Sequence, residues 1–284
     1  MRLPKHAGLF YERAESLLNK QIEECFLDER GPGTLPSSKK NNSLKAVIVP
    51  HAGYIYSGPC AAWAYKEIAE SEMPDLFILM GPNHYSSESG FSMETFETPL
   101  GLTRVKQDFA RKLSEKGTLK QNEQIHIDEH CLEVQIPFLQ FIFKNKIEKI
   151  NILPILLSRN VDLKKLSIDI KETLMETKQK AIFIISSDFT HYGRNYHYIP
   201  FLSDLKKRIY DLDGKAIEFI KKVEAENFKD YIKEKSATIC GAIPIELLLR
   251  TIKSDKVLLE QYYTSGDVIG DYKNSVSYSS IIFK

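Results

Sequence analysis

The sequence lacks the features of small disulfide-rich, membrane-spanning and signal-bearing proteins. Its four cysteines, in 284 residues, include no C-x-x-C pair, which excludes zinc ribbons and thioredoxin-type motifs. No apolar run reaches the about 18 residues of a membrane span, and the N-terminus has no apolar signal-peptide core. We therefore predict a cytoplasmic protein with reduced thiols and no membrane association.

An excess of charge of one sign is also absent. The chain has 39 basic and 38 acidic residues, for a formal net charge of +1, and no basic stripe. Because nucleic-acid binding depends largely on neutralising phosphates, we predict no nucleic-acid partner. Hydrophobic residues make up 43% of the chain, enough for one large core, so we predict a single domain over residues 1–284.

Short apolar runs alternate with stretches of helical periodicity along most of the chain. Strands are predicted at 45–50, 76–82, 150–157 and 181–188. Helices are predicted at 10–25, before a turn-rich loop at 28–43, at 57–70 with Ser57 as N-cap, at 105–117 and at 163–174. Segment 91–105 indicates a hairpin, and 257–263 and 275–283 indicate antiparallel strands. The predicted fold is α/β, with a mixed, mainly parallel central sheet flanked by helices.

Histidines follow three of the predicted strands within a few residues. His51 and His84 follow the first two strands, and Asp188 and His191 follow the fourth. Because loops converge beyond the carboxyl ends of parallel strands, we predict a metal or acid–base site there. The alternative for any single histidine is an ordinary hydrogen-bonded loop residue.

Two further segments carry candidate groups. In 128–133, His130 and Glu133 would share a face if a helix has begun by then, and Pro137 predicts a kink further along. The alternative is that Asp128 and Glu129 are favourable charges at a helix N-terminus. Cys240 precedes the helical stretch 245–249, where a thiol can have a depressed pKa, although a buried cysteine is more often inert.

Several motifs, taken in order, resemble the Memo family, whose prokaryotic members are named AmmeMemoRadiSam system protein B. They cover nearly the whole chain and read RLP, PHAGYIYSG, GPNHY, DEHCLEVQIPFL, ILPILL, SSDFTHYG, ICGAIPI and SVSYSS. The resemblance implies a class III extradiol dioxygenase-like fold, the fold of non-haem iron enzymes that cleave catechol rings. It also implies pathway partners of the AMMECR and radical SAM types.

The resemblance implies metal ligands at His51, His84 and Cys240, with Asp188 and His191 lining the same cleft and His130 reaching it. The dioxygenases instead use two histidines and a carboxylate. A thiolate is softer and oxidisable, which favours copper(I), zinc or a redox-active iron over ordinary dioxygenase chemistry. We expect iron(II) as the metal, with copper and zinc as alternatives.

Three functions fit this pattern. The first is a mononuclear iron oxidoreductase in which His191, assisted by Asp188, moves protons. The second is a non-catalytic module that binds a peptide or partner protein in the same cleft, with the rings of Tyr54, Tyr56 and Tyr85 around it. The third is a zinc hydrolase with Asp188 or Glu133 as base. The expected ligand is a small molecule or a peptide.

Overall fold

The four apolar runs form neighbouring parallel strands at the centre of one sheet. The strands are β1 (Ala46–Val49), β2 (Leu76–Pro82), β3 (Gly90–Phe91), β4 (Phe96–Thr98), β5 (Gly101–Val105), β6 (Asn151–Leu157), β7 (Ala181–Ser186), β8 (His191–Gly193), β9 (Val257–Thr264) and β10 (Asn274–Phe283). In this computed structural model, which describes residues 1–38 and 44–284, the strand order is β4-β5-β6-β2-β7-β1-β10-β8. Strand β3 pairs with β6, and β9 pairs with β10. Strands β6, β2, β7 and β1 are parallel, whereas β10 runs antiparallel to β1 and β9.

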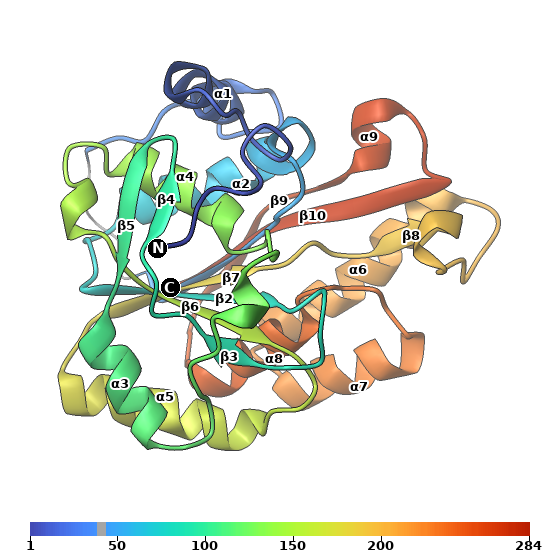
Figure 1. Ribbon diagram of the computed structural model, residues 1–284. Coiled ribbons are helices and arrows are strands. Elements are labelled where there is room, and N and C mark those ends of the chain that lie inside the picture. Colours follow the sequence, from blue (N-terminus) through green and yellow to red (C-terminus); the bar gives the residue numbers. More distant parts are fainter. Residues whose placement is uncertain (39–43) are drawn as a thin grey trace.

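Helices cover both faces of this sheet (Figure 1). They are α1 (Glu15–Leu27), α2 (Tyr54–Ala69), α3 (Gln107–Glu115), α4 (Ile136–Ile142), α5 (Leu163–Thr177), α6 (Leu205–Lys221), α7 (Ala225–Lys235), α8 (Ala242–Thr251) and α9 (Ser265–Ile269). Side chains alternate along each strand, so Val47 and Val49 belong to the core on the side of α1, α2 and α4, whereas Ala46 and Ile48 belong to the core on the side of α3, α5 and α8. Within the described residues, no helix is both long and apolar enough to cross a bilayer.

This architecture confirms the predicted fold class and is consistent with the class III extradiol dioxygenase-like fold. Each predicted strand is present, the 91–105 segment contains the β4–β5 hairpin, and the two tail strands extend the sheet antiparallel. The predicted turn-rich loop has no helix or strand over 28–38, and its residues 39–43 lie outside the described residues. Continuous apolar runs were sufficient to predict these strands, because strands that are buried on both faces have no polar side.

Three local predictions are wrong, each at the start of a helix. The helix predicted at 10–25 begins only at Glu15, because the chain before it forms a turn in which the N–H of Gly8 donates to the carbonyl of Tyr11. Ser57 is not an N-cap, because α2 begins one turn earlier, at Tyr54, and the Ser57 hydroxyl donates to the carbonyl of Ala52. The backbone N–H of Tyr54 is instead satisfied by the carbonyl of Phe10 at 2.8 Å. Pro137 does not kink a helix, because α4 begins beside it and proline is well accommodated in a first turn.

The end of α5 provides a stability test away from the histidines and Cys240 at the sheet edge. Lys178 is exposed and adopts the left-handed conformation, with φ +53°. We expect Lys178→Gly to raise the free energy of unfolding by about 0.5–1 kcal/mol, because relief of left-handed strain exceeds the entropy that glycine costs. Denaturant unfolding measures this change. Lys165→Gly, inside α5, should instead lower stability by about 1 kcal/mol, and a loss of stability in both variants would contradict the prediction.

Candidate metal centre

Two parallel strands of the central sheet place His51 and His84 at the same edge of the sheet. His51 follows β1 and His84 follows β2, and β7 lies between these two strands. The loop that carries His51 is fixed by Asp188, which follows β7 and accepts the backbone N–H of His51 at 2.8 Å. The predicted convergence of loops therefore occurs, and it brings two imidazoles together.

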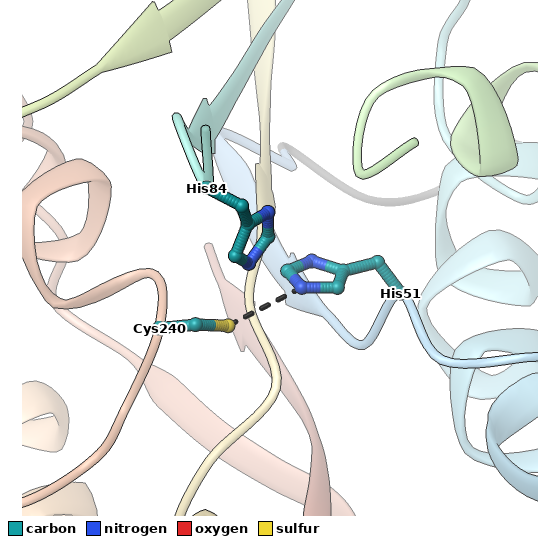
Figure 2. Close-up of side chains that lie close together, drawn as sticks. All are labelled: His51, His84 and Cys240. Carbon is teal, nitrogen blue, oxygen red and sulfur yellow. Dashed lines mark hydrogen bonds between the residues drawn. The ribbon is translucent and has the colours of Figure 1, made fainter. Parts of the chain in front are cut away.

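The thiol of Cys240 completes a group of three donor atoms. Figure 2 shows the two rings and the thiol directed toward one another, with Cys240 Sγ 3.2 Å from His51 Nε2. One donor atom from each of His51, His84 and Cys240 lies within 4.8 Å of the other two. Donors that bond one ion at about 2.0–2.3 Å lie within about 4.5 Å of one another. The residues present therefore fit a single transition-metal ion.

A close backbone contact positions Cys240. Gly241, the residue before α8, donates its N–H to Ser187 Oγ at 3.1 Å. A Cβ at Gly241 would overlap the Ser187 side chain and approach the carbonyl oxygen of Ser186 to 3.0 Å. Glycine at this position therefore allows the loop before α8 to lie against the end of β7, which places the thiol beside His51.

The electrostatics of Cys240 differ from the prediction for a cysteine at a helix N-terminus. Burial and the nearby charge of Asp188 raise the pKa of the Cys240 thiol well above its ordinary value. Burial, together with His130 and His84, lowers the pKa of His51 well below its ordinary value. At neutral pH the site thus contains a neutral thiol and a neutral imidazole, and a bound cation would favour the thiolate.

Glu129 connects His84 with a third imidazole, that of His130. The His130 ring centroid lies 5.3 Å from that of His51 and 5.1 Å from that of His84, and the rings of Phe10 and His6 lie 4.5 and 5.7 Å from it. The buried carboxylate of Glu129 accepts Nδ1–H of His84 at 2.9 Å and contacts Nδ1 of His130 at 3.2 Å. Although burial opposes it, hydrogen bonds from His130 and His84 hold the pKa of Glu129 below its ordinary value.

The alternative interpretation, in which Asp128 and Glu129 are only favourable charges at a helix N-terminus, is therefore wrong for Glu129, which binds the two histidines. Asp128, its neighbour, is exposed and pairs with Lys5 at 2.6 Å. Glu133 also does not share a face with His130. Instead it is buried against Arg2 at 3.3 Å, because the chain only enters a short 3-10 turn at Glu133.

Asp188 and His191 lie beside the three-donor group rather than in it. Nδ1 of His191 contacts the carbonyl oxygens of Phe189 and Thr238 at 2.9 and 3.0 Å, and its ring lies against Tyr196. Burial raises the pKa of Asp188, although interactions with His191 and with backbone N–H groups oppose the shift. In the structure, the contact of Asp188 with this group is the hydrogen bond that it accepts from the backbone N–H of His51, which holds the His51 loop in place.

Some residues at the site were not found by sequence reasoning, and one predicted residue is elsewhere. Ser186 and Gln135 hydrogen-bond beneath His51, but a serine at a strand end and a glutamine in a helical period carry no distinctive signal. Tyr54 is buried against Phe138, with its hydroxyl on the carbonyl of Val134, and so is not a ring surface of the cleft. Tyr54 is the first residue of α2 and lies on the side of that helix that packs against Phe138 of α4.

Comparisons with known proteins agree with the motif resemblance. A family model described as Memo-like protein matches residues 2–282. Proteins described as MEMO1 family protein are similar over full length: one from Sulfurisphaera tokodaii is 36% identical, covering 100% of this chain and 99% of its own, and one from Thermotoga neapolitana is 35% identical, covering 99% of each. The crystal structure of an uncharacterised protein from Escherichia coli K12 is similar in fold, with a TM-score of 0.53 and 12% identity, covering 85% of this chain and 100% of its own.

Proposed function

The chain belongs to the Memo-like protein family, and we propose that it binds one redox-active transition-metal ion, with iron(II) as the first candidate, at His51, His84 and Cys240. The observation that carries the proposal is the approach of one sulfur and two imidazole nitrogens to within 4.8 Å of one another. Three protein ligands leave further positions on such an ion for a substrate.

The charge distribution around the site supports a cation. Glu129, Glu133 and Asp188 are buried carboxylates, and Arg2 is the only buried lysine or arginine among the residues that the structure describes. Arg2 is already paired with Glu133. A divalent cation would compensate the remaining negative charge, including that of a Cys240 thiolate.

The chain's own side chains supply proton acceptors near the donor group. His191 directs Nδ1 to two backbone carbonyls, which only accept hydrogen bonds, so this nitrogen carries the proton and Nε2 is the basic atom. His130 directs Nδ1 to Glu129, which leaves Nε2 as its basic atom as well. When bound, iron would supply one-electron redox chemistry and Lewis acidity. A small molecule or peptide would bind beside these two histidines. We propose that His191 and His130 use their Nε2 atoms to accept protons from this ligand or to return them to it.

The zinc-hydrolase and partner-binding alternatives are less well supported. Glu133 is engaged by Arg2, by the N–H of His6 and by the hydroxyl of Tyr11, so it does not serve as a free base. Of the three tyrosines proposed for partner binding, Tyr56 and Tyr85 are exposed but Tyr54 is not. Asp188 remains the candidate base of a zinc hydrolase. Analysis of the bound metal distinguishes a zinc hydrolase from an iron protein.

Anaerobic titration with iron(II) tests the proposal. We expect one ion per chain, together with a concentration-dependent rise in melting temperature, because a ligand of the folded state alone stabilises it by about 2.7 kcal/mol at a hundredfold excess over its Kd. The double variant His51→Ala, His84→Ala should show neither effect, whereas His197→Ala, which alters a histidine outside the donor group, should behave like the unmodified protein. Wild-type protein that binds neither iron(II), copper(I) nor zinc under reducing conditions would remove the proposal.

A further inference from the structure

The buried hydroxyl of Ser186 has fixed hydrogen-bond roles. Its Oγ lies 2.6 Å from the carbonyl oxygen of Cys131, and two oxygens so close need a hydrogen between them. A carbonyl cannot donate, so the single hydroxyl proton of Ser186 is directed at Cys131. Toward its other neighbours, Ser186 can therefore only accept.

Gln135 closes this network. Its Nε2 donates to the carbonyl of Pro50 at 3.0 Å, while its Oε1 accepts the hydroxyl of Tyr65 at 2.7 Å, so the orientation of the amide is determined. The second proton on Nε2 then donates to Ser186 Oγ at 2.9 Å. Of the two lone pairs on that oxygen, one is occupied and one remains for His51.

His51 Nδ1 lies 2.9 Å from Ser186 Oγ, in a position where this oxygen can only accept. The proton of the neutral His51 ring must therefore sit on Nδ1. The other nitrogen, Nε2, keeps its lone pair, and this is the atom that lies 3.2 Å from Cys240 Sγ. The hydrogen bond from Nδ1 to Ser186 thus determines that the His51 ring directs a lone pair, and not an N–H, at the thiol of Cys240.

Glu129 imposes the same tautomer on His84 by different chemistry. Its carboxylate accepts the backbone N–H of His84 at 2.8 Å and that of Cys131 at 3.1 Å, in addition to Nδ1 of His84 and of His130. Each of these groups directs an N–H at an oxygen of Glu129, which acts only as an acceptor, as an ionised carboxylate does. A carboxylate cannot donate, so the neutral form of His84 carries its proton on Nδ1, and its Nε2 keeps the lone pair.

We infer that Ser186 and Glu129 are positioning residues that hold His51 and His84 as Nδ1–H tautomers, so that both Nε2 lone pairs face Cys240. This inference rests on the proposed metal site for its functional meaning. A metal ion bonds an unprotonated imidazole nitrogen, so both rings are prepared before any ion arrives. Outer partners of this kind typically contribute 10- to 100-fold to metal affinity.

The tautomers can be measured without metal, by long-range ¹H–¹⁵N correlation of the imidazole rings in the metal-free protein. We expect His51 and His84 to show the pattern of a neutral ring protonated at Nδ1. In Ser186→Ala, His51 should populate the Nε2–H tautomer, because its Nδ1 then has no acceptor. Ser279→Ala removes another fully buried hydroxyl, one without a hydrogen-bond partner among the described residues, and should leave the His51 signals unchanged.

Zinc(II) affinity, measured in competition with a chelator, links the tautomers to the site. We expect Ser186→Ala and Glu129→Gln each to weaken binding 10- to 100-fold, and Ser279→Ala to bind like the unmodified protein. Glutamine should not replace Glu129, because its amide NH₂ would face at least one of the four N–H donors.

The outcomes separate this inference from the proposed function. If His51 in the unmodified metal-free protein is protonated at Nε2, the inference is wrong even if metal binds tightly. If Ser186→Ala retains both the Nδ1–H signal and full zinc affinity, Ser186 is not a positioning residue. If no metal binds but the tautomers are as expected, the proposed function fails and the assignment of the two rings stands.

Discussion

Replacing Cys240 with serine is expected to weaken copper(I) and zinc binding by at least about a hundredfold, the upper end of what loss of an outer-shell partner costs. The thiol is the one soft donor in the group, and soft metals depend on it. The same change should remove the visible absorption of the iron(III)-loaded protein, because that absorption requires a thiolate ligand. Metal competition and absorption spectroscopy measure the two effects.

Two further variants sharpen this result. Cys60→Ala alters a cysteine that is fully buried outside the donor group, and it should leave both measurements unchanged. Cys240→Asp recreates a set of two histidines and one carboxylate, so it should keep iron(II) while losing copper(I). An unaltered visible band in the serine variant would show that Cys240 is not a ligand.

Replacing Arg2 with methionine is expected to lower the free energy of unfolding by about 3–5 kcal/mol, the usual loss when one member of a buried ion pair is removed. Arg2 and Glu133 are 6% and 1% exposed, 3.3 Å apart. The variant leaves the carboxylate of Glu133 buried without its cation. It also removes the hydrogen bond from Arg2 to the carbonyl of Glu129. Guanidinium unfolding at neutral pH measures the loss.

The matched control changes both members of the pair. Arg2→Met combined with Glu133→Gln removes the uncompensated charge, and glutamine still offers an oxygen to the N–H of His6 and the hydroxyl of Tyr11. The double variant should therefore recover most of the lost stability. Equal destabilisation of the single and double variants would indicate that the charge of Glu133 is not what makes Arg2 important.

The sequence predicted the sheet because the strands that carry the site are apolar throughout. Runs such as 76–82 and 181–188 are short, apolar and bounded by turn residues, which favours buried strands, and their parallel arrangement placed His51, His84 and Asp188 at one edge. Local periodicity could not predict where α2 begins. That start depends on the carbonyl of Phe10, a contact between distant parts of the chain.

The inner structure of the site could not be predicted for a related reason. Ser186, Gln135 and Glu129 act through hydrogen bonds that join separate segments, and no spacing along the chain records such bonds. The nearness of Cys240 to His51 came from the family resemblance rather than from any pattern in the residues. The metal, its chemistry, the cytoplasmic location and the radical SAM and AMMECR-type partners stay predictions.

The position of β10 has a consequence for biosynthesis. This strand supplies the antiparallel neighbour of β1, yet the ribosome makes it long after β1, and after every residue of the donor group. Until β10 has been synthesised, β1, the strand that leads to His51, has one edge without a neighbouring strand. Such an edge can pair with other chains, so we expect the nascent protein to be exposed to aggregation at a stage when His51, His84 and Cys240 have already been made.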